Sequence, residues 1–211
     1  LDGLVARIHL AGDDSPRELV LPVPGEHMAL NALAALIAVR DYGGDVSEAL
    51  EALTHFGGVN RRFQYHGHVG GIRVYDDYAH HPTEARAVLT AAREVADADA
   101  QGLGHPGRVI VCFQPHLFSR TEQFAEEFAK ALDLADYAIV LDIYGAREKP
   151  IPGVTSELIT TQLTIPHKYQ PDFSKVPYDV AAIAEPGDIV LTMGAGNVTM
   201  EADAVIALLK G

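Results

Sequence analysis

The stretch that decides the fold is residues 71–84, which read Gly-Ile-Arg-Val-Tyr-Asp-Asp-Tyr-Ala-His-His-Pro-Thr-Glu. Its first five residues are rich in β-branched and aromatic side chains and alternate, which is typical of a strand. Pro82 suits the first turn of a helix, and Thr83 and Glu84 supply a polar helix start. Ligands usually bind where a strand of an α/β sheet leads into a helix, because the helix N-terminus offers free backbone donors. The sequence therefore places acids, imidazoles and a phenol at an expected anion site.

Two other interpretations of this stretch stay open. Histidines near a turn can be merely solvated, and acids before a helix can serve only its dipole. Four histidines could instead gather around zinc, namely His66, His68, His80 and His81. No Cys-x-x-Cys or His-Glu-x-x-His spacing accompanies them. The density of titratable groups at one junction favours a functional site.

Strand and helix patterns alternate on both sides of this stretch. Before it we expect a hairpin, two helices and a second hairpin, at residues 5–23, 26–42, 47–55 and 62–76. After it we expect strands at 109–113, 137–142 and 189–193, and helices at 82–96, 119–134, 155–162, 180–184 and 198–209. Residues 98–107 form an expected surface loop. The alternation predicts an α/β fold with a doubly wound, mostly parallel Rossmann-like sheet, preceded by an incomplete α/β piece of a second domain.

Composition limits the function classes. The chain has 211 residues, 48% of them hydrophobic, and a net charge of −13, which argues against general affinity for nucleic acid. It has no apolar stretch of membrane-spanning length. Cys112, the single cysteine, lies in an apolar run and fits a buried strand in a reducing cytoplasm. A P-loop and a Gly-x-Ser-x-Gly elbow are both missing from the sequence.

Two segments that follow expected strands carry arginines. In residues 114–121, Ser119 and Glu122 have the spacing of a capping box, so Arg120 would lie in the first helical turn. An arginine there can offer paired donors to a carboxylate or phosphate, or simply form a surface salt bridge. Arg147 follows the next strand. Because loops after adjacent parallel strands project together, Arg120 and Arg147 could converge on one cleft.

A glycine pair follows the last expected strand. Gly194 and Gly196 permit a tight turn whose amides, including that of Ala195, could hold an anion. A plain turn with Asn197 as the cap of the next helix is the competing interpretation. The Rossmann spacing with a third glycine is not met.

Taken together, these segments resemble one family, the Mur ligases. The resemblance rests on residues 24–35, 58–64 and 76–84, which read Pro-Gly-Glu-His-Met-Ala-Leu-Asn-Ala-Leu-Ala-Ala, Gly-Val-Asn-Arg-Arg-Phe-Gln and Asp-Asp-Tyr-Ala-His-His-Pro-Thr-Glu. It extends to residues 114–121, 144–148 and 194–197, in the same order along the chain. These last three loops favour the alanine-adding member over the ligase that recycles the murein tripeptide.

The resemblance implies a domain organisation. The family has a UDP-sugar domain, a central ATPase domain and a C-terminal Rossmann-like domain. Residues 1–65 would be the end of the central domain and residues 66–211 the C-terminal domain. The N-terminal domains of the same polypeptide would then be partners that this stretch lacks, and the chain alone would be inactive. The exposed edge of the first hairpin leaves pairing in a homodimer as an alternative.

The implied reaction joins L-alanine to the lactyl carboxylate of UDP-N-acetylmuramate. That carboxylate attacks the γ-phosphate of ATP, and the amine of L-alanine then displaces phosphate from the acyl phosphate. A carboxylate needs such activation because its oxygen is otherwise a poor leaving group. Cations and Mg²⁺ would stabilise the transferred phosphoryl group.

Residue roles follow from the same match. The resemblance implies ATP-binding roles for Asn31 (adenine), Arg62, Asp77 (ribose) and Tyr78. It implies catalytic roles for His80 and Arg120, and substrate contacts for His116, Arg120, Arg147, Gly194 and Ala195. His27 is the one expected magnesium ligand.

Two departures from the family pattern are visible. Met28 stands where many relatives have an asparagine, so one polar nucleotide contact would be lost or supplied by His27. Leu117 stands where some relatives have an arginine, so Arg120 would hold the substrate anion with less help. Two rival classes stay open. The chain could be a non-catalytic module that binds nucleotide or amino acid, or a generic α/β domain whose basic loops serve a protein partner.

Overall fold

The structure is a computed structural model that describes residues 3–98 and 107–210. It divides into two compact units, residues 1–59 and 60–211, so the division falls earlier than the expected boundary at residue 65. Most of the predicted surface loop at 98–107 lies outside the described residues. No described helix has the length and apolar character needed to cross a bilayer.

The first unit is a two-stranded antiparallel sheet with two helices. Strands β1 (Leu4–Ile8) and β2 (Arg17–Leu21) pair with Leu4 opposite Leu21, and helices α1 (Glu26–Asp41) and α2 (Val46–Thr54) follow. Buried apolar side chains from the strands and helices form one core, among them Leu19, Leu21 and Leu36. Asp45 caps α2, because its carboxylate accepts the backbone N–H groups of Ser47 and Glu48. The predicted hairpin and two helices are confirmed.

The second unit is a six-stranded sheet with the order β3-β4-β8-β5-β6-β7. Only β3 is antiparallel, to β4, and every other neighbouring pair is parallel. The strands are β3 (Gln64–Val69), β4 (Ile72–Asp77), β5 (Val109–Phe113), β6 (Tyr137–Leu141), β7 (His167–Gln170) and β8 (Ile189–Met193). The predicted mostly parallel sheet is confirmed.

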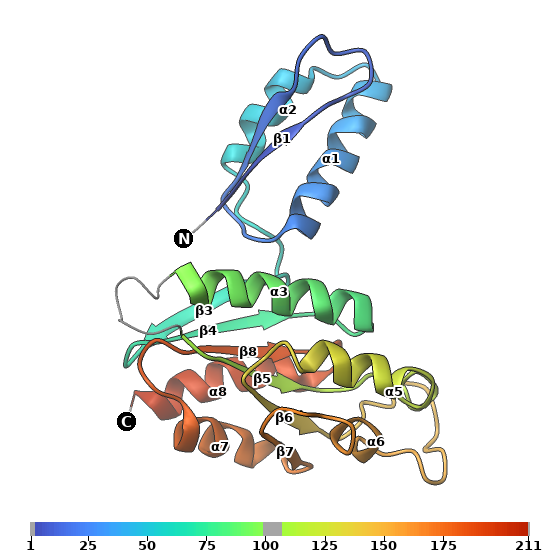
Figure 1. Ribbon diagram of the computed structural model, residues 1–211, viewed down its shortest axis with the longest axis vertical. Coiled ribbons are helices and arrows are strands. Elements are labelled where there is room, and N and C mark those ends of the chain that lie inside the picture. The colour runs from blue at the N-terminus through green and yellow to red at the C-terminus, as the bar shows by residue number, and fades with distance from the viewer. Residues whose placement is uncertain (1–2, 99–106, 211) are drawn as a thin grey trace. The chain divides into compact units, whose positions relative to one another are not determined.

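Helices cover both faces of this sheet (Figure 1). One buried cluster joins the sheet to α3 (Pro82–Ala98), α5 (Phe118–Leu132) and α6 (Glu157–Thr160), and includes Phe113 and Phe128. The other joins it to α7 (Val176–Ile183) and α8 (Met200–Leu209), and includes Cys112. Phe113 and Cys112 belong to different clusters because successive strand side chains point to opposite faces. Cys112 is fully buried as predicted, and burial raises the pKa of its thiol.

Some elements differ from the sequence prediction. Strand β7 was missed because its sequence, His-Lys-Tyr-Gln, is polar, as suits an edge strand paired on one side only. Helix α7 begins at Val176 rather than Val180, with Pro177 in its first turn, where a missing N–H costs nothing. A short 3₁₀ turn, η2 (Asn197–Thr199), precedes α8, so the α-helix proper begins at Met200.

Candidate active site

Four loops meet at one edge of the sheet in the second unit. Strands β4, β8, β5 and β6 run parallel, with Asp77 beside Met193, Met193 beside Phe113, and Phe113 beside Val140. The loops that leave these strands therefore emerge side by side. They carry the residues predicted from sequence at 78–81, 194–197, 114–120 and 142–148. This is the edge where open α/β sheets bind their ligands.

The β4–α3 junction holds His80 in place. Glu84 reaches back to accept the backbone N–H groups of His80 at 3.0 Å and His81 at 3.2 Å. Burial opposes charge on Glu84, but these donors and the nearby His80 imidazole hold its pKa below the ordinary value. His80 Nδ1 lies 3.0 Å from the carbonyl oxygen of Tyr78, to which it can donate. Glu84, in the polar helix start predicted from the sequence, therefore holds the backbone of the two histidines in place.

Three predicted side chains meet at this edge. Arg120 Nη1 lies 3.3 Å from the His80 carbonyl oxygen and 3.4 Å from His116 Nδ1. The His80 and His116 rings are 5.6 Å apart. Burial, followed by the charges of His80 and Arg120, lowers the pKa of His116. A neutral imidazole beside a fixed guanidinium can accept a proton while the guanidinium binds an anion.

Four rings form a series across the same edge. Tyr78, His80, His116 and Tyr144 lie in this order, with successive centroids 5.2, 5.6 and 5.7 Å apart. Tyr78 and Tyr144, the two ends, are exposed, whereas the histidines between them are half-buried. The series comes from three different loops, so it fixes those loops relative to each other.

Other predicted residues at this edge are less involved. Arg147 is exposed and forms no ion pair with the described residues, so its convergence with Arg120 stays a prediction. The Gly194 amide is not free for an anion, because it donates to the Asp77 carbonyl oxygen at 3.0 Å. Asn197 does not cap a helix and instead accepts a hydrogen bond from Gln114 Nε2 at 2.9 Å. Ala195 is half-buried beside these residues.

The two glycines of this loop allow close packing. A Cβ on Gly196 would lie 2.2 Å from Gln114 Oε1 and 2.8 Å from Tyr144 Cγ. A Cβ on Gly194 would lie 2.6 Å from the Gln114 carbonyl oxygen. Gln114 Oε1 also accepts the Val198 N–H at 3.1 Å. The Gln114 side chain therefore occupies the space beside the loop at residues 194–197.

The capping box predicted at Ser119 is wrong. Helix α5 begins after Leu117, which has a φ of 73° and makes no side-chain cap. Ser119 lies inside the first turn, where its N–H and its hydroxyl both donate to Glu148. The carboxylate that satisfies this helix end thus comes from a different loop, which local spacing could not reveal.

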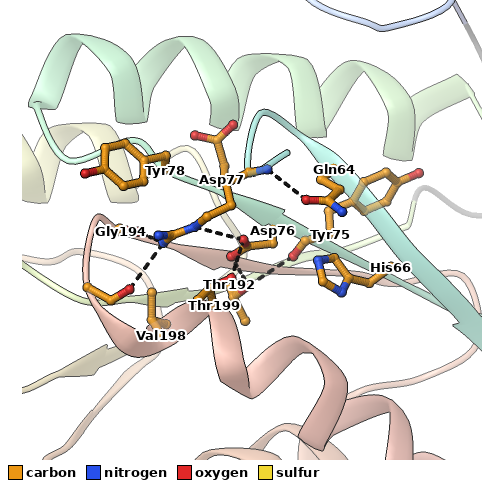
Figure 2. Close-up of polar contacts among 12 residues, drawn as sticks. Gln64, His66, Tyr75, Asp76, Asp77, Tyr78, Thr192, Gly194, Val198 and Thr199 are labelled. Atoms are coloured by element: carbon orange, nitrogen blue, oxygen red, sulfur yellow. Dashed lines mark hydrogen bonds and ion pairs between the residues drawn. The ribbon is translucent and has the colours of Figure 1, made fainter. Parts of the chain in front are cut away.

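A buried network that the sequence did not reveal lies beneath the site. Asp76 is fully buried and accepts hydrogen bonds from Thr192 and Thr199, both at 2.7 Å, and from Arg61 at 3.3 Å (Figure 2). Arg61 also donates to the carbonyl oxygens of Gly194 at 2.5 Å and Gly196 at 3.3 Å. Its guanidinium lies 4.7 Å from the centre of the Tyr78 ring. The family resemblance implies a role for the neighbouring Arg62 and none for Arg61.

The hydrogen bonds of the Asp77 carboxylate go to the protein's own backbone. The carboxylate is buried and accepts the N–H groups of Phe63 and Ala79, both at 2.7 Å. Burial raises its pKa to about 6, although these donors and the charge of Arg62 oppose the rise. The Asp77 carboxylate therefore connects the segment before β3, through Phe63, with the β4–α3 junction, through Ala79. The role of Asp77 as a ribose contact stays a prediction.

The Asp77 pKa leads to a pH prediction. Because the folded pKa of about 6 lies above the reference value of 3.8, the folded state holds an extra proton between these two values. Stability should therefore fall as pH rises from about 4 to about 6, by a total of about 3 kcal/mol. Urea unfolding of the wild type and Asp77→Asn across this window isolates the effect. The wild-type advantage over the variant should shrink with rising pH, and a growing advantage would contradict the assignment.

The remaining predicted nucleotide and metal residues are spread over both units. Arg62 lies 5.8 Å from the Tyr78 ring centre, within the second unit. Asn31 is exposed and His27 is half-buried, both on α1 of the first unit. No group of three or more metal-binding side chains occurs within residues 3–98 and 107–210, which also removes the predicted zinc alternative there. Of the four histidines considered for zinc, His66 pairs with Asp203, with 3.1 Å between His66 Nδ1 and Asp203 Oδ1.

Comparison with known proteins places this site in a family. The family model described as "Mur ligase, glutamate ligase domain" matches residues 61–196. UDP-N-acetylmuramate–L-alanine ligases from Rhodococcus opacus and Rhodococcus erythropolis are 55% and 56% identical to this chain. Each match covers 99% of the chain and 43% or 42% of the relative. The chain therefore spans less than half the length of these relatives.

Solved structures agree with this placement. The UDP-N-acetylmuramate–alanine ligase of Thermotoga maritima is 31% identical, with a TM-score of 0.72, over 90% of this chain and 39% of that one. A murein peptide ligase from Psychrobacter arcticus is 23% identical, with a TM-score of 0.67, over 95% and 40%, and supports the fold alone. With the model match covering most of the second unit, these likenesses show that the chain belongs to the Mur ligase family.

Proposed function

We propose that this chain is part of an ATP-dependent ligase that joins L-alanine to the lactyl carboxylate of UDP-N-acetylmuramate. The observation that carries the proposal is the 55–56% identity, over 99% of this chain, to ligases of that name. We assign the first unit to the end of a central ATP-binding domain and the second to the C-terminal domain of a longer polypeptide. We place the reaction in a reducing cytoplasm, which the single buried cysteine fits.

The site geometry supports roles for three side chains. Arg120 would bind the carboxylate of L-alanine, because its guanidinium offers paired donors beside His116. His80 and His116 would stand near the amine. The attacking amine must be neutral, and an imidazole with a lowered pKa is unprotonated at neutral pH, so it has a free site to accept the proton that the amine loses. Arg147 is a second candidate for the carboxylate, since it is exposed on the neighbouring loop.

ATP is the proposed energy source. The Mur ligase of Thermotoga maritima with a solved ADP complex and the folylpolyglutamate synthase with AMPPNP and Mn share this fold at 22% and 20% identity. In this chain, Asn31, Arg62 and Tyr78 are the proposed nucleotide contacts. The described residues form no magnesium site of their own, so we assign at most the single ligand His27 to Mg²⁺.

A ligation assay tests the proposal. The full-length polypeptide that contains this sequence is mixed with ATP, Mg²⁺, UDP-N-acetylmuramate and L-alanine, and phosphate release is followed with each component omitted in turn. We expect release only with all components, and none from the present chain alone. Release with the murein tripeptide instead of L-alanine would favour the recycling ligase. Binding of L-alanine or ATP without any release would favour a non-catalytic module.

A further inference from the structure

Helix α5, which carries Arg120, begins in an unusual way. Its N-cap is Leu117, an apolar residue in the left-handed region with a φ of 73°, and no side chain of its own segment caps it. The carboxylate of Glu148, from the loop after β6, takes that place. It accepts the Ser119 N–H at 3.0 Å and the Ser119 hydroxyl at 2.5 Å. The negative charge also suits the positive end of the helix dipole.

The two loops are joined at further points. Leu117 N–H donates to the Tyr144 carbonyl oxygen at 2.9 Å, and Tyr144 N–H donates to that of Pro115 at 2.8 Å. The Tyr144 ring stacks on that of His116. Gly145 has no room for a side chain, because a Cβ there would lie 2.7 Å from the Phe118 ring. The loop after β6 is thus a template on which the loop after β5 is shaped.

The position of Arg120 depends on this template, the loop after β6, because Arg120 directly follows Ser119 in the chain. Its long side chain reaches His80 and His116 from the first turn of α5. A shift of that turn would move the guanidinium away from both. The Ser119 hydrogen bonds lower the pKa of Glu148, so it is ionised at neutral pH, and its charge partly offsets the lowering of the His116 pKa.

We propose that Glu148 is a positioning residue, which locks the first turn of α5 so that Arg120 and His116 face the amino-acid substrate. The inference rests on the proposed function, because it assigns that substrate to Arg120. Glu148 acts through Ser119 and its charge, and does not itself touch the substrate.

Kinetics of variants in the full-length ligase provide the first test. Glu148→Ala should raise KM for L-alanine about tenfold, the loss expected for a helix cap and a displaced partner, and leave KM for ATP unchanged. Glu148→Gln keeps an oxygen that can accept from Ser119, so it should recover most of the affinity. Ser119→Ala removes one of the two hydrogen bonds and should fall between them. Glu126→Ala is the matched control, because Glu126 lies on the same helix but pairs only with Lys130 in solvent.

The pH dependence of kcat/KM separates the effect of the Glu148 charge on His116 from the effect of Glu148 on the position of Arg120. Because the Glu148 charge favours protonated His116, both Glu148 variants should move the acid limb of kcat/KM to lower pH. Only Glu148→Ala should also change KM strongly. A merely structural cap would lower thermal stability in proportion to lost activity and would move neither the pH limb nor the KM for L-alanine selectively, which would overturn the proposal.

Amide hydrogen exchange in the present chain makes the test independent of ligation. The Ser119 amide should exchange about tenfold faster in Glu148→Ala than in the wild type or Glu126→Ala. Unchanged exchange overturns the positioning role even if the ligase is active. Faster exchange in a full-length protein that never ligates would refute the proposed function while supporting the template. If Glu148→Ala fails to fold, Glu148→Gln and Ser119→Ala decide, and an unchanged acid limb in Glu148→Gln together with an unchanged KM for L-alanine in Ser119→Ala overturns the proposal.

Discussion

Replacing Arg120 with alanine should lower kcat/KM for L-alanine about 100- to 1000-fold in the full-length ligase. The guanidinium is half-buried and held between the His80 carbonyl oxygen and His116, so its charge is placed by the protein where the carboxylate would bind. Truncating a charged partner in such a setting typically costs 2–5 kcal/mol, about 30-fold to several thousand-fold in rate. Steady-state rates of phosphate release at varied L-alanine concentration measure the effect. Most of it should appear in KM, with a smaller loss in kcat.

Arg86→Ala is the control for this prediction. Arg86 is an exposed arginine on α3, so the variant carries the same change of net charge. It should leave the kinetics of L-alanine unchanged. Similar rates for Arg120→Ala and Arg86→Ala would contradict the placement of Arg120 in the amino-acid site.

Replacing Asp76 with alanine should destabilise the second unit by about 3 kcal/mol. The change removes the acceptor for Thr192 and Thr199 and leaves Arg61, whose side chain is 25% exposed, without its carboxylate. Removing the buried partner of this ion pair leaves the partly buried Arg61 charge uncompensated, which is the main cost. Urea denaturation of the present chain measures it as a lower midpoint.

Asp203→Ala provides the comparison for Asp76. Asp203 also pairs with a basic residue, His66, but its side chain is 81% exposed. Its removal should cost less than about 1 kcal/mol, as for other surface pairs. An Asp76→Ala variant that unfolds at the wild-type midpoint would show that the Asp76 network does not stabilise the folded state.

The fold could be predicted where sequence patterns are strong. Apolar runs such as residues 109–113 and 189–193 became the central strands, because a strand covered on both faces must be apolar throughout. Strand β7 could not be found, since one-sided pairing at the sheet edge places no demand on apolar residues. Ser119 and Glu122 have the local spacing of a capping box, but the Ser119 N–H donates to the carboxylate of Glu148, which comes from another loop.

The site was predictable as a set of loops but not in its bonding. His80, His116 and Arg120 meet as expected, because parallel strands project their loops to one edge. Which of two adjacent arginines turns inward depends on backbone conformation, and Arg61 has a φ of 58° that no pattern in the sequence announced. Glu148 is another such case, since its partner lies 29 residues away in sequence. These assignments depend on tertiary contacts, which local sequence does not encode.

We propose that Arg120 binds the carboxylate of the amino-acid substrate. The most direct test of this proposal compares L-alanine with L-alaninamide, which lacks that charge, as substrates of the full-length wild type and of Arg120→Ala. The wild type should prefer L-alanine by at least about 100-fold in kcat/KM, and the variant should lose most of that preference because of weakened L-alanine use. An unchanged preference in Arg120→Ala would contradict the account, because the carboxylate would then be recognised elsewhere.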